Sequence, residues 1–159
     1  MPTEFFVPPD QIDPDHPEMG IEEIRKSIPQ RYEMEMLNAI LRFDPANKIV
    51  IGYRGVRADE FWCRGHIPGR PLMPGVLMIE AAAQLCTFYY QRVQEGAGDR
   101  FLGFAGLEGV KFRRTVVPGD RLVIVAKNTE LRLRRAVFDC QGLVGEHLAF
   151  EATIIGMPV

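Results

Sequence analysis

The sequence is poor in cysteine and has no marked excess of charge of either sign. Its three cysteines, Cys63, Cys86 and Cys140, lie far apart in a chain of 159 residues and cannot all pair with one another. Such sparse use is typical of reduced thiols in the cytosol and argues against a secreted disulfide framework. A formal net charge of −2 gives no support for nucleic-acid binding, which normally needs a basic excess or a basic face.

The sequence also lacks long apolar runs and internal repeats. Its start, Met1 to Phe6, has no basic stretch followed by an apolar run, so we expect no signal peptide. The most apolar stretch, 74–90, contains Glu80 and Gln84 and fits a core helix better than a membrane span. With 47% hydrophobic and 25% charged residues, the chain has the composition of one globular domain. We therefore expect a cytoplasmic protein that does not enter a membrane.

Proline, glycine and hydrophobic periodicity divide the chain into elements. Residues 1–17 hold five of the twelve prolines and show no periodicity, which predicts an extended N-terminal arm before a single domain at 18–159. Helices are predicted at 18–28 and at 75–95, the second apolar over most of its circumference and ended by the glycines at 96 and 98. Strands are predicted at 33–43, 48–56, 101–114, 121–135, 136–144 and 147–155, and Pro-Gly-Asp at 118–120 predicts a turn. One long helix and consecutive antiparallel strands predict an α+β fold whose sheet curls around the helix.

The segment from 65 to 84 carries the candidate chemistry. Prolines fix the backbone around His66, and histidine is suited to proton transfer near neutral pH. Gly75 lies at a helix start, where unpaired N–H groups can hold a developing oxyanion. Glu80 lies inside the helix among apolar neighbours, and a partly desolvated carboxylate can act as an acid. A base, an enolate stabiliser and an acid are the parts that an elimination next to a thioester carbonyl requires.

Each of these residues also has a purely structural interpretation. A lone histidine in a loop more often serves as a structural hydrogen-bonding residue, and Gly75 alone is simply a glycine at a helix start. Glu80 shares its helix face with Gln84, Thr87 and Gln91, which is also the pattern of a solvated stripe. Residue types and spacing by themselves leave these alternatives open.

The same segment closely resembles the signature of the β-hydroxyacyl-acyl carrier protein dehydratases of the FabZ type. That signature is Gly-His-Phe-Pro-x-x-Pro-x-Met-Pro-Gly-Val-Leu-x-x-Glu-Ala-x-Ala-Gln, and residues 65–84 match nearly every fixed position. Further likeness at 104–106, 110–114 and 117–120 extends the resemblance over roughly residues 28–156. It implies the hot-dog fold, in which a curved antiparallel sheet wraps around one long central helix.

The resemblance further implies an activity and a role for three residues. The activity is conversion of (3R)-hydroxyacyl thioesters to trans-2-enoyl thioesters and water in fatty-acid biosynthesis. His66 would take the α-proton, the Gly75 N–H would hold the thioester oxygen, and Glu80 would help the β-hydroxyl leave. Family members are homodimers or trimers of dimers, so His66 of one subunit would face Glu80 of the other. No cofactor or metal is implied, since the Cys-x-x-His at Cys63 and His66 lacks a second ligand pair at zinc spacing.

The chain departs from the family pattern at several positions other than the acid and the base. Gln30 and Glu33 stand where the family usually has His and Pro. Asn38 and Ala39 replace an Asp-Arg pair, and Ile67 replaces the Phe of the signature. These departures bear on acyl-chain preference and on subunit contacts.

An acyl carrier protein is the partner that the resemblance implies, because carrier proteins are acidic and present the substrate on a phosphopantetheine arm. Six basic residues are candidates for its binding surface: Lys111, Arg113, Arg114, Arg132, Arg134 and Arg135. Any single one of them fits a solvated strand face equally well.

Two other functions stay open beside the dehydratase. One is a hot-dog acyl thioesterase, and the other is a non-catalytic subunit that binds acyl groups or a carrier protein. The intact His66 and Glu80 argue against the binding subunit. The sequence at 73–77, Met-Pro-Gly-Val-Leu, argues against the thioesterase.

Overall fold

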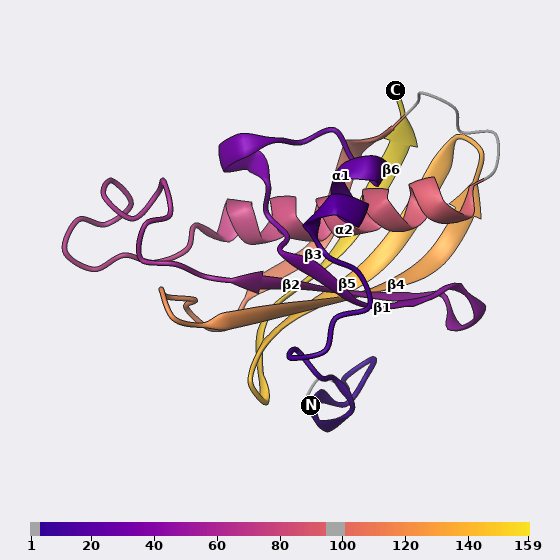
Figure 1. The fold of residues 1–159 in the computed structure, drawn as a ribbon. Coiled ribbons are helices and arrows are strands. Elements are labelled where there is room, and N and C mark those ends of the chain that lie inside the picture. Colours follow the sequence, from indigo (N-terminus) through magenta and orange to yellow (C-terminus); the bar gives the residue numbers. More distant parts are fainter. Residues whose placement is uncertain (1–3, 95–100) are drawn as a thin grey trace.

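A computed structural model describes residues 4–94 and 101–159 and has the α+β architecture that the sequence predicts: an antiparallel sheet curved around one long helix (Figure 1). The strand order is β1-β2-β4-β5-β6-β3, and every neighbouring pair is antiparallel. The strands are β1 (Ala39–Asp44), β2 (Ile49–Gly55), β3 (Leu102–Phe112), β4 (Arg121–Arg132), β5 (Arg135–Val144) and β6 (His147–Pro158). The helices are α1 (Ile21–Ser27) and α2 (Gly75–Val93). The order leaves β1 and β3 as the two edges of the sheet.

Helix α2 forms the centre of the core. Eleven of its 19 residues are buried, which confirms the prediction of a core helix. Tyr89 packs edge-on against Phe43 of β1 and Phe138 of β5, so aromatic rings bridge the helix and the sheet. The helix ends at Val93, and the glycines predicted to end it, at 96 and 98, lie outside the described residues. Among the residues that the structure describes, no helix is long and apolar enough to cross a membrane.

The loop at 56–74, between β2 and α2, is fixed at both of its ends. The N–H of Val56 donates to the carbonyl of Asp120 at 3.0 Å, and the N–H of Met73 donates to the carbonyl of Val116 at 2.7 Å. The predicted turn at 118–120 forms as expected, with φ of +97° at Gly119, a conformation that glycine adopts without strain. The loop that carries His66 is therefore held against the connection between β3 and β4.

The predicted strand at 33–43 is wrong in its first half. Tyr32–Met34 form a 3-10 turn, and pairing with β2 starts at Ala39. Tyr32 has φ of +58°, which is incompatible with a strand, and the N–H of Met36 bonds to the side chain of Gln84 instead of a strand neighbour. The helix predicted from residue 18 begins later, at Ile21.

Residues 4–17, predicted as an extended arm, lie against the face of the sheet opposite α2. Val7 is buried in a cluster of apolar side chains, among them Ile51, that β1, β2, β4 and β5 direct to this face of the sheet. Gln141 of β5 fastens the arm: its Oε1 accepts from the N–H of Phe6 at 2.9 Å and its Nε2 donates to the carbonyl of Glu4 at 2.8 Å. The arm thereby covers apolar side chains that the sheet turns away from the helix.

Candidate active site

His66 lies half-buried in the loop ahead of α2, and a backbone carbonyl orients its imidazole. Its ring nitrogen Nδ1 lies 2.7 Å from the carbonyl oxygen of Leu72. The backbone N–H of His66 donates to the carbonyl of Trp62 at 2.8 Å. Because a carbonyl only accepts, Nδ1 carries the proton of the neutral ring, and Nε2 keeps its lone pair. A base that acts through Nε2 needs this tautomer.

The residue after His66 has an unusual backbone conformation. Ile67 has φ of +59°, and a β-branched residue in the left-handed region costs about 1–3 kcal/mol. The turn is closed by a hydrogen bond from the N–H of Arg70 to the carbonyl of Ile67 at 2.9 Å. Such local strain persists where the surrounding structure over-determines it, as the anchored loop does here.

His66 lines a hollow of about 520 Å³, a volume typical of sites for small ligands. Its walls come from three elements: the loop, the first turn of α2 and the end of β3 with the residues after it. The lining residues are His66, Leu72, Met73, Gly75, Val76, Met78, Phe112, Arg113, Arg114 and Thr115. Apolar walls with one histidine and two arginines suit an acyl chain that carries a polar group.

Gly75 is the first residue of α2 and lines the same hollow. The first N–H groups of a helix have no carbonyl partner within that helix, and they lie at the positive end of its dipole. A Cβ at Gly75 would lie 2.7 Å from the ring of Phe112, so only glycine allows this ring to pack over the helix start. Gly75 therefore combines an available N–H with a close approach of an aromatic wall.

Glu80 lines a different, smaller hollow of about 80 Å³. It is half-buried on α2, and its Oε1 accepts a hydrogen bond from Nε2 of Gln84 at 3.0 Å. Gln30, Thr87 and Phe104 are among the other residues around this hollow. Within one chain, the predicted base and acid therefore do not share a hollow.

The six basic residues fall into two groups at opposite ends of the sheet. Lys111, Arg113 and Arg114 lie at the end of β3 and just beyond it, and the two arginines line the His66 hollow. The other group occupies the hairpin between β4 and β5, where Arg132 is opposite Arg135. Gly156 of β6 pairs both with the start of β5 and with the start of β3, so this hairpin lies at the end of the sheet where β3 begins. Glu130 forms ion pairs with both of these arginines. Within one chain the six do not form a single patch.

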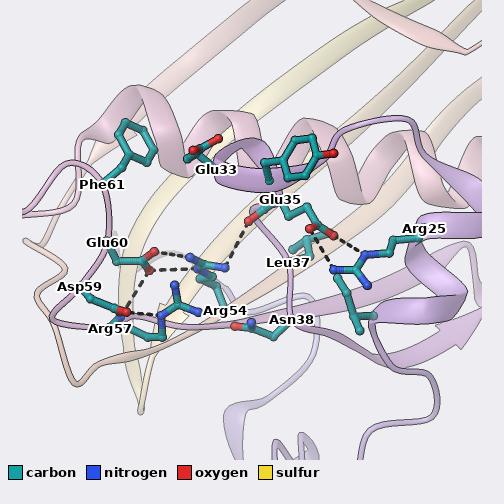
Figure 2. A pocket seen from close by; sticks show the side chains of 12 residues that line it. Arg25, Glu33, Glu35, Leu37, Asn38, Arg54, Arg57, Asp59, Glu60 and Phe61 are labelled. Atoms are coloured by element: carbon teal, nitrogen blue, oxygen red, sulfur yellow. Dashed lines mark hydrogen bonds and ion pairs between the residues drawn. The ribbon is translucent and has the colours of Figure 1, made fainter.

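A charged hollow of about 400 Å³ contains none of the predicted site residues (Figure 2). Arg54 and Glu60 pair there with each other, and both are only 8% exposed. Arg57 pairs with Asp59 at 2.8 Å. Among the described residues, each arginine of this hollow pairs with a carboxylate of the same chain, so the hollow offers no unpaired cation for the candidate chemistry.

Four of the departures from the family pattern lie near these hollows or at the start of β1. Gln30 lines the Glu80 hollow, and among the described residues its buried Oε1 has no hydrogen-bond partner. Glu33 lines the charged hollow. Asn38 accepts from the N–H of Gly55 at 2.7 Å, and Ala39 is the first, buried residue of β1.

Sequence reasoning missed two residues that shape the site. Phe112 walls the His66 hollow, and the carbonyl of Leu72 orients the imidazole. Phe112 lies in the segment 110–114 that resembles the family, but its contact with the helix start crosses the fold and has no signal in the sequence. The carbonyl of Leu72 has no signal at all, because every residue has a backbone carbonyl. In the described part of the chain, no three His, Cys, Asp or Glu side chains are grouped so that they could hold a metal ion.

Comparisons with known proteins place this geometry in a family. The FabA-like domain family matches residues 28–153. The chain is 38% identical over 138 residues to the 3-hydroxyacyl-(acyl-carrier-protein) dehydratase FabZ of Clostridioides difficile, covering 86% of this chain and 95% of the relative. It is 39% identical over 137 residues to the FabZ of Pelotomaculum thermopropionicum, with 86% and 96% covered.

Two solved structures share the fold. The dehydratase heterocomplex ApeI:P of Xenorhabdus doucetiae has a TM-score of 0.71 at 14% identity, covering 86% of this chain and 90% of that one. A sigma28-regulated virulence protein of Campylobacter jejuni has a TM-score of 0.65 at 15% identity, covering 92% and 95%. At such low identity these two compare the fold alone. Together with the sequence relatives, the match over most of the domain shows that the chain belongs to the FabA-like domain family and, within it, to the FabZ-type dehydratases.

Proposed function

We propose that the chain is a hydro-lyase that converts (3R)-hydroxyacyl thioesters of an acyl carrier protein to trans-2-enoyl thioesters and water. The observation that carries this proposal is the 35–39% identity to proteins named as FabZ dehydratases, nearly over their whole length. The signature at 65–84, which differs from the family pattern only at Ile67, and the apolar hollow beside His66 support it.

His66 and Gly75 carry the first half of the proposed reaction. Nε2 of His66 takes a proton from the α-carbon, and the electron pair moves toward the thioester carbonyl. The N–H of Gly75 stabilises the charge that develops on the carbonyl oxygen. The locked tautomer of His66 and the helix-start position of Gly75 support these roles.

Glu80 carries the second half. The electron pair returns to form the Cα–Cβ double bond as the C–O bond of the β-hydroxyl breaks. Glu80 donates a proton to the departing oxygen, which leaves as water. Elimination of water is not a net redox reaction, so we propose that it needs no redox cofactor. We propose that it also needs no metal, because His66 and Glu80 supply the base and the acid and Gly75 supplies the group that stabilises the oxyanion.

The proposed site is shared between two chains of a homo-oligomer. Two observations support this proposal: His66 and Glu80 line separate hollows, and β3 is an unpaired edge of the sheet. Edge strands normally avoid large apolar side chains, but Phe104, Leu107 and Phe112 of β3 are 44–52% exposed. Pairing of β3 with a second copy would cover this edge and bring a partner's surface to each hollow.

Lys111, Arg113 and Arg114 are the proposed contact for the acidic carrier protein, because all three are exposed and the two arginines line the His66 hollow. Arg113 pairs with Glu151 at 3.1 Å, and Lys111 is opposite Glu151 in the sheet, so Arg114 is the sharper probe. We further propose that the protein works in the cytoplasm, a location that three free cysteines support.

The test of the function separates it from a thioesterase. The protein is incubated with a 3-hydroxyacyl thioester, enoyl absorbance follows dehydration, and a thiol reagent reports hydrolysis. We expect enoyl product without thiol release. Thiol release without enoyl product would establish the thioesterase instead. If neither signal appears, the non-catalytic binding subunit is the remaining alternative.

The test of the shared site mixes two inactive variants, His66→Ala and Glu80→Gln, under conditions of subunit exchange. With random pairing at equal amounts, about half of the dimers are mixed, and each has one intact site, so about a quarter of the site activity should return. Verified exchange without recovery would place both residues in a site within one chain.

A further inference from the structure

The N-terminal arm covers an apolar face of the sheet, on the side opposite α2 (Figure 1). The strand register sets Tyr53, Val123 and Leu143 side by side on this face, with Ile51 beside Val125 in the next row. Six apolar side chains from four strands are buried there: Leu41, Ile49, Ile51, Val123, Val125 and Leu143. A sheet normally buries such a face against a second layer, which in β-sandwiches is another sheet. In this chain the arm takes the place of that second layer.

The arm is attached to this face by few contacts. A single arm residue is buried, and the arm forms no strand pair with the sheet. Apart from the clamp at Gln141, Arg42 donates to the carbonyl of Gln11 at 2.6 Å, and Arg121 pairs with Asp15. Both of these contacts are exposed to solvent, where polar contacts add little to stability. A segment held in this way can detach while the sheet stays folded.

The covered face fits a second copy of this chain. Charges of both signs border its apolar patch: Arg121 and Lys127 lie on β4. Asp139 of β5 and Glu151 of β6 lie on the other side of the patch. A two-fold axis can set the basic side of one copy against the acidic side of another, and the same apolar patch then serves both copies. A strongly acidic or strongly basic partner would instead meet like charges.

We propose that the arm caps an assembly surface: it occupies the face on which the sheet would otherwise pack against the same face of a second copy. While the arm is docked, the protein stays in the assembly that its other surfaces form. When the arm detaches, the exposed apolar patch joins two such assemblies face to face. The arm lies outside residues 28–153, which match the family, and opposite the helix that carries Glu80. The inference therefore does not rest on the proposed dehydration.

Two substitutions in the full chain should release the arm, and a matched third should not. Val7→Asp puts a carboxylate among the apolar side chains of the face, where burial of an unpaired charge is costly. Gln141→Leu removes both hydrogen bonds to the start of the arm at similar volume. Pro8→Asp is the control, because it adds the same charge one residue further on, at an exposed position before a 3-10 turn.

Proteolysis and light scattering supply the readouts. Cleavage by chymotrypsin at Phe5 or Phe6 reports release of the arm, and light scattering gives the mass of the assembly. We expect Val7→Asp and Gln141→Leu to be cleaved faster than wild type and to reach about twice its mass as concentration rises. Pro8→Asp should match wild type in both readouts. A synthetic peptide with the sequence of the arm, added in excess to Val7→Asp, should occupy the face and restore the wild-type mass.

A released arm with the wild-type mass would overturn the proposal. Open-ended aggregation in place of a doubled mass would also overturn it, and so would a doubled mass that the peptide does not lower. If Gln141→Leu does not fold, or Val7→Asp keeps its arm docked, the double variant Phe6→Asp/Val7→Asp carries the same readouts. An arm still docked in that variant would show that it does not detach. A wild-type protein without dehydratase activity would reject the proposed function and leave the mass readouts valid.

Discussion

Replacement of Gly75 by alanine tests how the start of α2 is built. The added Cβ would lie 2.7, 2.8 and 3.1 Å from three atoms of the Phe112 ring. Carbon atoms in ordinary contact are about 3.5–4.0 Å apart, so the ring must retreat by about 1 Å. Phe112 is 52% exposed and can swing toward solvent, so we expect a cost near the lower end of the 1–3 kcal/mol of overpacking.

Gly75→Ala should therefore separate stability from activity. Alanine is the better helix former by about 1 kcal/mol, which offsets much of the clash, and each remaining kcal/mol lowers Tm by about 2–4 °C. Activity should fall about 10- to 100-fold, because a displacement of about 1 Å beside the reacting groups can cost about 100-fold. Thermal unfolding and the enoyl absorbance assay measure the two effects. Gly20→Ala, at the start of α1 with no atom within 4 Å of the new Cβ, is the control.

A double-mutant cycle decides whether the ring is the cause. In a Phe112→Leu background the ring is absent, and Gly75→Ala should then cost little further activity. If Gly75→Ala costs the same factor in both backgrounds, the close approach of Phe112 does not explain the glycine.

Three further predictions concern single groups. The hydrogen bonds from Arg25 lower the pKa of Glu35 below its usual 4.5, so they stabilise the fold above that pH and lose this effect as pH falls through the lowered value. Arg25→Met should thus lower the free energy of unfolding, measured with urea, by about 1 kcal/mol at pH 7 and by progressively less in acid. A difference from wild type that does not shrink in acid would contradict this. Burial raises the pKa of Cys86, so a thiol reagent should modify Cys63 quickly in the native protein and all three cysteines after unfolding; rapid native modification of Cys86 would refute its burial. His66→Ala should stay folded and lose about 10²–10⁴-fold in activity, and near-normal turnover would reject it as the base.

The sequence predicted the elements whose signals are local. The proline-rich loop, the core helix and the turn at 118–120 all depend on residues within a few positions of one another, and all three are present. The prediction of a strand at 33–38 is wrong because the backbone of this segment binds the side chain of Gln84 and not a neighbouring strand. Gln84 lies 48 and 50 residues away in the sequence, so no local pattern indicates these hydrogen bonds. The six basic residues lie in two groups within one chain for a related reason. Strand sequences predict that Arg114 and Arg132 are exposed, but the register between the strands places them at opposite ends of the sheet.

For the candidate site, the residue types were predictable and their arrangement was not. His66, Gly75 and Glu80 stand out through the prolines, the helix start and the apolar surroundings. Nothing in the spacing indicates that His66 and Glu80 line separate hollows, because that depends on which face of α2 meets the sheet. The orientation of the imidazole depends on a carbonyl oxygen, and every residue has one.

The N-terminal arm imposes an order on folding. Its anchoring hydrogen bonds join Phe6 and Glu4 to Gln141, across 135 and 137 residues. During synthesis the arm therefore leaves the ribosome long before its binding surface on β5 exists. Its prolines and acidic residues disfavour pairing with strands that form earlier, before the binding surface on β5 is present. Among the described residues, the hydrogen bonds of the docked arm to Gln141 span most of the chain, so docking closes a long loop and needs β5 in place.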